Sequence, residues 1–355
     1  MTALSICKNR IKKGPDKDEA FHQSEQIGSR SAYNSLENCL RIERGAPFSH
    51  QSFPASPLNV TIALVAFSFA SLLAPAVYAQ DALVPLKQEA HDGKSADEVA
   101  RELANPNNSL ASLTFKNQYR WYDGSLPGAG NQDNYTMLFQ PVFPFTLEPT
   151  ASGGKANLFV RPGIPILFEQ PVFNPLTGTF DKETGLGDIG FDIGYGVTEP
   201  SGFLWALGMV GTLPTATNSA FAGKQLRLGP EVLLAKFEDW GLYGLFPSHQ
   251  WDVAGWGDRS FNSSQLQVFL TWLPGGGWSI GSTPIMNYDW NSNQWTIPIN
   301  LTVGKTVKFG KMPVKLQAEI NYYVEKPDTF GSEWMIGFNF TPVVANFVDK
   351  WIRGN

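Results

Sequence analysis

Cysteine and histidine are scarce in this chain. Its 355 residues include two cysteines and four histidines, and both cysteines, Cys7 and Cys39, precede a predicted signal-cleavage point after Ala79. A mature chain without thiols excludes disulfide frameworks and cysteine-bound metals. Only His91 and His249 follow the cleavage point, so a histidine-rich metal site is not expected either. The sequence therefore predicts a protein without metal or other cofactor.

Positive charge is also in short supply. The chain has 27 basic and 32 acidic residues, of which eight and six precede the predicted cleavage point. That leaves 19 basic and 26 acidic residues, a net charge of −7 for the mature chain. Nucleic-acid-binding domains carry basic patches, so a nucleic-acid partner is not expected.

One long apolar run is present, Asn59–Leu73, and Pro75 follows it. Small residues then occupy the positions that a signal peptidase reads, which predicts cleavage between Ala79 and Gln80. The alternative is a membrane anchor over Leu58–Tyr78, which is just long enough to span a bilayer. Pro75 and the small residues that precede the predicted cleavage point favour cleavage and export over a membrane anchor.

The remaining chain divides by composition. Residues 1–58 are polar and unpatterned, which predicts disorder or a wrongly assigned start. Ser95 and Glu98 form a capping-box pattern, so a short helix is expected to run to about Ala104. The predicted organisation is an extension at 1–58, a signal peptide at 59–79, a periplasmic lead-in at 80–110, one barrel domain at 111–342 and a C-terminal tail at 343–355.

From Leu113 onward, apolar and polar residues alternate with a period of two, which is typical of strands with one face in an apolar environment. About twelve such segments are predicted. They begin near Leu113, Asn134, Ala156, Gly187, Gly202, Gln225, Trp240, Ser264, Gly277, Gln294, Pro313 and Glu333. Short and long connections alternate between them, as in outer-membrane barrels with tight periplasmic turns and longer outer loops.

Aromatic residues collect at the ends of these segments. Trp240 and Trp251 bracket one, and Trp278 and Trp290 bracket another, a spacing close to the ~25 Å apolar band of an outer-membrane barrel. Amphipathic rings prefer the headgroup level. The predicted membrane-interface girdles comprise Trp121, Tyr135, Trp205, Trp240, Trp251, Trp272, Trp278, Trp290, Trp295 and Trp334. A soluble β-sandwich with core aromatics is the alternative, but it gives no reason for aromatics at both strand ends.

The charged residues of the alternating segments are predicted to face the barrel interior. They are Lys116, Arg120, Asp188, Asp192, Arg227, Glu231, Lys315, Glu319 and Glu333. Closure places the first strand beside the last, so Lys116 or Arg120 is expected to approach Glu333. Two interpretations stay open: a structural ladder that satisfies buried charge, and a lining that selects solutes.

Two patterns resemble enzyme motifs without their context. Gly185–Gly190 matches the dinucleotide-binding G-x-G-x-x-G, but a strand follows where that motif requires a helix; inward glycines that leave room in a lumen are the better interpretation. Asp188 and Asp192 share a strand face about 13 Å apart, too far for a glycosidase pair.

Ser248 and His249 invite comparison with a hydrolase. Adjacent strand residues point to opposite faces, so the two side chains are not expected to pair as nucleophile and base. His249 is expected to face outward near the girdle. The sequence therefore predicts no catalytic residues.

Five ordered motifs carry a resemblance to a known family. They are Glu102-Leu-Ala-Asn-Pro, Gln140-Pro-Val-Phe-Pro-Phe, Gly185-Leu-Gly-Asp-Ile, Thr212-Leu-Pro-Thr-Ala-Thr and Gln294-Trp-Thr-Ile-Pro-Ile-Asn-Leu. From about Glu102 to Pro342 the chain resembles a Gram-negative outer-membrane barrel family regarded as transporters, often mislabelled "neuromedin U". That family is similar to proteins named for a MetA pathway of phenol degradation. The resemblance implies a barrel and a transport role, and brings no catalytic residues.

The expected fold is all-β, a single-chain antiparallel transmembrane β-barrel of about twelve strands with a short N-terminal helix, in the outer membrane of a Gram-negative bacterium. The expected function is passage or uptake of a small solute, aromatic and apolar ones included, through a narrow lumen. Expected partners are outer-membrane lipid, lipopolysaccharide, the solute, and the barrel-assembly machinery during biogenesis. The alternatives are a structural or receptor-like barrel with a plugged lumen and an outer-membrane hydrolase.

Overall fold

The computed structural model describes residues 94–353. The predicted extension, the signal peptide with its Ala79–Gln80 cleavage site, and the anchor alternative all lie outside the described residues. Within residues 94–353, no helix is both long enough and apolar enough to cross a membrane.

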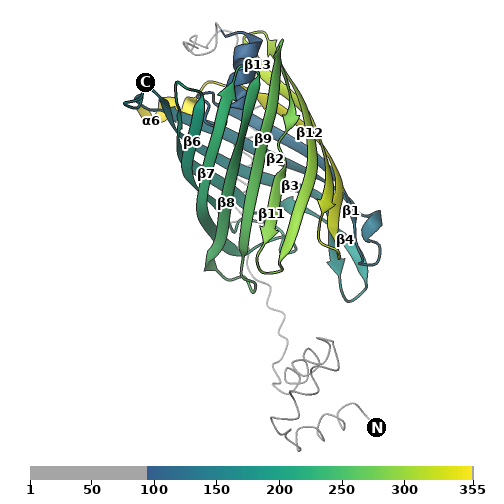
Figure 1. Ribbon diagram of the computed structural model, residues 1–355. Helices are drawn as coiled ribbons and strands as arrows, with labels where there is room; N and C mark the ends of the chain where they lie inside the picture. The colour runs from purple at the N-terminus through teal and green to yellow at the C-terminus, as the bar shows by residue number, and fades with distance from the viewer. Residues whose placement is uncertain (1–93, 354–355) are drawn as a thin grey trace, which may run out of the picture. The chain divides into compact units, whose positions relative to one another are not determined.

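Fourteen strands form one antiparallel sheet that closes on itself as a twelve-strand barrel (Figure 1). The wall runs through β1 (Ser112–Asp123), β2 (Asp133–Thr146), β3 (Lys155–Asn174), β5 (Ile189–Thr198), β6 (Phe203–Leu213), β7 (Gln225–Glu238), β8 (Gly241–Gly255), β9 (Asn262–Gly275), β10 (Trp278–Ser282) with β11 (Ile285–Asp289), β12 (Gln294–Phe309), β13 (Met312–Glu325) and β14 (Gly331–Pro342). The ladder between β1 and β14, from Phe115↔Phe340 to Asp123↔Gly331, completes the barrel. The fold class is therefore as the two-residue alternation predicts.

Two details of the wall differ from the prediction. The connection between the third and fourth predicted segments contains a β-hairpin, because β3 continues to Asn174 and pairs with β4 (Thr179–Leu186). The ninth predicted segment is split, since Thr283 and Pro284 interrupt it between β10 and β11. A proline lacks the N–H that a ladder needs, which accounts for the interruption.

Within residues 94–353, three short helices accompany the barrel: α5 (Ala96–Ala104), η1 (Ala129–Asn131) and α6 (Phe347–Arg353). The predicted capping box is present at α5, because the Ser95 side chain accepts from the Glu98 N–H while the Glu98 carboxylate accepts from the Ser95 N–H. α6 lies in the C-terminal tail, for which the sequence pattern predicts no element.

The outward face of the wall is apolar and exposed, as lipid contact requires. Leu207, Leu234, Ile299, Leu301 and Ile336 are among the exposed apolar side chains. The ten predicted girdle aromatics lie near strand ends, six toward the long loops and four toward the tight turns. Eight of them are 40–51% exposed, and Tyr135 and Trp205 are half-buried. Their depth in a bilayer stays a prediction.

Large side chains meet glycines inside the turn end of the barrel. Phe159 packs with Leu204, Leu233 and Leu242 in a cluster of buried residues. A Cβ on Gly194 would lie 2.4 Å from the Phe159 ring, so the bare glycine admits that ring. The space beside Gly194 is thus filled by a neighbouring ring.

The interrupted strand leaves a gap in the hydrogen-bonded wall. β12 pairs with β10 at Gly281↔Thr302 and with β11 at Asn287↔Thr296, while the ladder between these points is missing. The Asn300 Oδ1 atom accepts from the Thr283 N–H at 2.7 Å. A side-chain amide thus replaces a ladder bond where an unpaired N–H in hydrocarbon would cost several kcal/mol.

The close approach at Gly194 makes a testable prediction. Gly194→Ala should lower the free energy of unfolding by about 1–3 kcal/mol, because Phe159 is enclosed and cannot move aside. Urea unfolding in lipid vesicles measures this. Gly190→Ala is the matched control, since it lies on the same face of β5 and its nearest neighbour is Gly211 O at 3.8 Å. Equal stability of the two variants would contradict the packing argument.

Candidate functional site in the barrel lumen

An ion pair joins β3 and β5 on the inward face of the wall. Arg161 on β3 donates from Nε to Asp192 Oδ1 on β5 at 2.6 Å, and the two side chains are 14% and 16% exposed. The same guanidinium lies over the rings of Phe159, at 4.7 Å, and Phe246, at 5.4 Å. Because Phe246 belongs to β8, Arg161 reaches from one part of the wall toward another and narrows the lumen.

Three more charges surround this pair. Lys116 on β1 interacts electrostatically with Glu319, Arg161 and Asp192. Glu231 on β7 is 4% exposed and interacts electrostatically with Asp192 and Arg161. The charges of β1, β3, β5, β7 and β13 therefore form one mixed belt, which we call the charge belt: Lys116, Arg161, Asp192, Glu231 and Glu319.

Amide side chains connect the charge belt to the wall. Asn300 and Asn321 donate to Glu319 Oε1 at 3.1 and 3.0 Å, and Asn300 also lies 2.7 Å from Asn321 Oδ1. Asn300 is the residue that accepts from Thr283 at the interrupted strand. Glu319 is thereby fixed relative to the one gap in the ladder between β12 and its neighbours.

Several polar atoms of the lumen have no protein partner within the part of the chain that the structure describes. They include Arg161 Nη2, Glu231 Oε1 and Asn339 Oδ1. Buried polar groups nearly always find a hydrogen-bond partner in the protein or in water. Buried water is the partner expected for such groups.

The other predicted lumen residues do not join the charge belt. Asp188 lies between β4 and β5, where its carboxylate accepts from Ala216 N at 2.9 Å and Gly223 N at 2.8 Å and so holds an outer loop. Arg227 lies over the Phe261 ring at 4.0 Å. Arg120 donates to Gln118 at 2.5 Å. The Lys315 chain lies beside Gly304.

Neither Lys116 nor Arg120 is a direct ladder partner of Glu333, so the expected approach to Glu333 stays a prediction. In the ladder between β1 and β14, Arg120 lies opposite Met335 and Lys116 opposite Asn339. Glu333 falls at a register shift, between residues that pair with Trp121 and Tyr122. Closure does join the first and last strands, but a bulge changes which side chains meet.

Arg161 was missed by the sequence reasoning. It stands directly before Pro162, and a proline argues against a regular strand, so its face could not be assigned. The signal that could have identified it is register: Arg161 and Asp192 are direct partners between β3 and β5. Opposite charges at facing positions are a stabilising cross-strand pair.

The segment that precedes β1 closes over the turn end of the barrel. α5 packs against β9, β10, β12 and β13. The Asp97 carboxylate accepts from Gly277 N, and Arg101 donates to Glu238 O at 2.9 Å and lies over the Phe237 ring. These contacts join the helix to two separate turns, so α5 lies across the mouth and does not extend away from it.

Residues after α5 continue this cover. Asn107 is buried; its carbonyl accepts from Asn157 Nδ2 on β3 at 3.0 Å, and a Cβ on Gly196 would collide with its side chain. Val99, Leu110 and Val343 form a small apolar cluster beneath the helix. We call residues 94–111 the turn-end cap.

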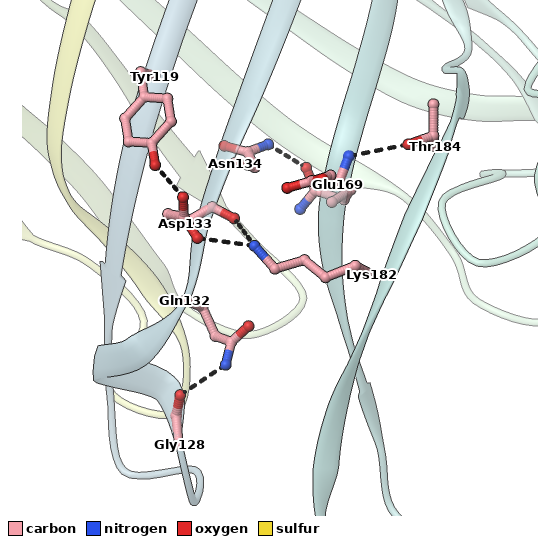
Figure 2. A network of polar contacts seen from close by, with 9 residues as sticks. Tyr119, Gly128, Gln132, Asp133, Asn134, Glu169, Lys182 and Thr184 are labelled. Atoms are coloured by element: carbon pink, nitrogen blue, oxygen red, sulfur yellow. Dashed lines mark hydrogen bonds and ion pairs between the residues drawn. The ribbon is translucent and has the colours of Figure 1, made fainter.

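The outer end carries the β3–β4 hairpin. Lys182 on β4 donates to the carbonyl and to Oδ1 of Asp133, at 2.6 and 2.8 Å, and Tyr119 donates to the same carboxylate (Figure 2). On the loop side, Phe180 contacts Phe330, which stacks on Tyr122. The hairpin is thus attached to β1, β2 and the β13–β14 loop.

A cavity of about 490 Å³ lies at this outer end. Its lining comes from β9, β11, β12 and the β13–β14 loop: Ser263, Asn287, Asp289, Ser292, Gln294, Thr296, Pro327, Asp328 and Thr329. Eight of these nine residues are polar, which suits a hydrated vestibule.

His249 lies beside a serine but lacks the third group of a catalytic triad among the described residues. His249 lies beside Ser264, with Nδ1 2.7 Å from Oγ, and Trp290 donates to that same hydroxyl at 2.9 Å. His249 Nε2 has no partner among the described residues, whereas a catalytic base is oriented by a third group. Ser264, not Ser248, is the neighbour, because cross-strand partners share a face. Within residues 94–353 no cluster of metal-ligating side chains occurs.

The turn-end cap predicts a gating variant. Arg101→Ala should raise ion conductance in planar bilayers, since it removes both the bond to Glu238 and the contact with Phe237. Glu148→Ala, an exposed carboxylate in the turn between β2 and β3, is the control at the same end of the barrel. Unchanged conductance in Arg101→Ala would show that these contacts do not limit passage.

The capping box predicts a pH dependence. Hydrogen bonds from the Ser95 backbone and side chain lower the pKa of Glu98 below its ordinary value of 4.5. A carboxylate with a depressed pKa stabilises the fold above its unfolded pKa, and this contribution is lost as pH falls through the folded pKa. Conductance should therefore rise below about pH 4.5. Glu98→Gln should weaken this rise; an identical profile would contradict the assignment.

Comparisons with known proteins support the barrel and do not identify the chain. No protein-family profile and no curated protein matches its sequence. An outer-membrane channel from Pseudomonas putida F1 matches with a TM-score of 0.51 and 11% identity, over 68% of this chain and 99% of that one. The NanC porin matches at 0.40, with 11% identity, over 66% and 99%. The outer-membrane phospholipase A from Escherichia coli matches at 0.35, with 11% identity, over 71% and 99%. The first likeness shows the fold alone, a transmembrane β-barrel, and the two weaker ones carry no argument.

Proposed function

We propose that this barrel resides in the outer membrane of a Gram-negative bacterium and passes a small solute through its lumen. The observation that carries the proposal is the charge belt itself, in which the paired Arg161 and Asp192 side chains keep 14% and 16% of their surface exposed. Rings of charged side chains that stay in contact with a lumen are what selects ions and polar solutes in channels.

The lumen suits a solute of limited size with both apolar and polar parts. Arg161 lies over two phenylalanine rings while one of its nitrogens stays without a protein partner. A ring or alkyl group packs on such aromatic faces, and a hydroxyl or carboxylate accepts from the guanidinium. Twelve strands lie between filled eight-stranded barrels and wide sixteen-stranded porins, which agrees with a narrow path.

The resemblance of the chain to a transporter-like outer-membrane family points the same way. Proteins similar to that family are named for a pathway of phenol degradation, which is consistent with an aromatic solute. The outer vestibule and the charge belt would then act in sequence, the first admitting a hydrated solute and the second selecting it. Lipid and lipopolysaccharide would surround the wall, and the assembly machinery would insert it.

Arg161→Ala tests the selecting role of the charge belt. Without the guanidinium the lumen is wider and Asp192 is uncompensated, so liposome swelling should be faster and the reversal potential in a salt gradient should shift toward cation preference. The substitution also breaks a buried pair, at a cost of about 3–5 kcal/mol, so heat-modifiable electrophoretic mobility must first confirm folding.

Two further variants make the comparison decisive. Arg161→Lys keeps the charge with a less extended head group, and should retain the ion preference while changing the size limit. Arg259→Ala removes an arginine from an exposed outer loop and should leave both properties unchanged. A panel of sugars, amino acids and aromatic acids identifies the solute class. If folded Arg161→Ala keeps the wild-type flux and ion preference, the charge belt does not line the path.

The turn-end cap favours a second candidate, a receptor-like barrel with a plugged lumen whose outer hairpin binds partners. The contacts of Asp97 and Arg101 with two turns are the specific observation behind it. Absence of flux in both the wild type and Arg101→Ala would support this candidate against the channel.

A further inference from the structure

The C-terminal helix α6 exposes more apolar surface than a water-facing helix normally does. Of its seven residues, Phe347 and Ile352 are each 60% exposed and Trp351 is 83% exposed, and Lys350 is exposed beside them. Exposed large apolar groups gathered on one short element mark a surface that contacts another apolar phase.

α6 is attached to the outward side of the wall at the turn end. The Phe347 ring meets Phe143 edge-on at 5.4 Å, and Asn346 donates to Pro144 O at 2.5 Å. Phe143 lies near the end of β2 and shares the alternation of Phe139, which pairs with outward-facing Phe115. The apolar surface of α6 therefore continues the lipid-facing surface of the barrel. Figure 1 shows α6 outside the wall, at the end of the barrel where α5 lies.

The aromatic girdle at this end is incomplete without α6. Its tryptophan and tyrosine side chains come from β5, β6, β8, β9, β10 and the turn between β7 and β8: Tyr195, Trp205, Trp240, Tyr243, Trp272 and Trp278. Among the described residues, β12, β13, β14, β1, β2 and β3 place no tryptophan or tyrosine near the tight turns. α6 packs against β2, within this second half of the circumference.

We propose that α6 is an interfacial anchor that lies in the inner leaflet of the outer membrane and completes the turn-end girdle. Phe347, Trp351 and Ile352 enter the boundary between headgroups and acyl chains, about 5–10 Å deep as for other interfacial helices. The Lys350 ammonium extends to the phospholipid phosphates. The occupant of this surface is therefore the phospholipid headgroup region, not a protein partner. The anchor is independent of any solute passage.

Depth-dependent fluorescence quenching tests this anchor. Cys7 and Cys39 are the only cysteines, so in a Cys7→Ser, Cys39→Ser background Trp351→Cys takes a single environment-sensitive label. The protein is reconstituted in phosphatidylcholine–phosphatidylglycerol vesicles that carry a nitroxide either near the headgroup or near the methyl end of the acyl chain. The label should be quenched most by the nitroxide near the headgroup, and its emission should be shifted to the blue.

Two labelled positions serve as matched references. Leu176→Cys, in the outer hairpin at a residue 94% exposed, should be quenched by neither nitroxide. Ile336→Cys, outward in the middle of β14, should be quenched most by the deep one. Electrophoretic mobility confirms that each variant is folded. A Trp351→Cys label that behaves like either reference, in water or deep in hydrocarbon, would overturn the proposal.

Discussion

Backbone pairing in hydrocarbon is the constraint on which this structure depends. Lipid offers no hydrogen bonds, so each strand must find two neighbours and the sheet must close. The β1–β14 ladder provides that closure. The interruption between β10 and β11 shows the same constraint, because Asn300 supplies an amide oxygen where Pro284 and its neighbours break the ladder. The same Asn300 amide also donates to Glu319. One side chain therefore both replaces the missing ladder bond and positions a member of the charge belt.

Filling the lumen follows a different rule from covering the wall. Outside, any apolar side chain of ordinary size suits fluid lipid. Inside, volume must match residue by residue, as Phe159 does with Gly194 and Asn107 with Gly196. The apolar cluster near the turn end supports the phenylalanine faces on which Arg161 rests. The charge belt thus lies next to an apolar cluster, and together they set the width and the polarity of the lumen at this level.

The segments at the two ends of the barrel are attached by different physical means. At the turn end, α5 uses the free backbone groups of the turns, such as Gly277 N and Glu238 O. At the outer end, the β3–β4 hairpin uses an ion pair and stacked rings. Groups that a ladder leaves unpaired at strand ends are available for such contacts. α6 differs from both, since it faces outward and meets the wall through Phe143.

The sequence by itself determined the wall. Alternation of side chains decides which face meets lipid, and this property is local, so the twelve strands could be placed within a few residues, together with the Ser95–Glu98 cap. Only the tertiary structure decided the partners across the lumen. Arg161 meets Asp192 and Phe246 because of register and curvature, and neither is encoded in a two-residue period. The Asp188 carboxylate accepts from two backbone N–H groups of a loop that is distant in sequence, and α6 became visible only through its contact with the wall. Faces follow from local pattern, whereas contacts between distant strands depend on how the sheet closes.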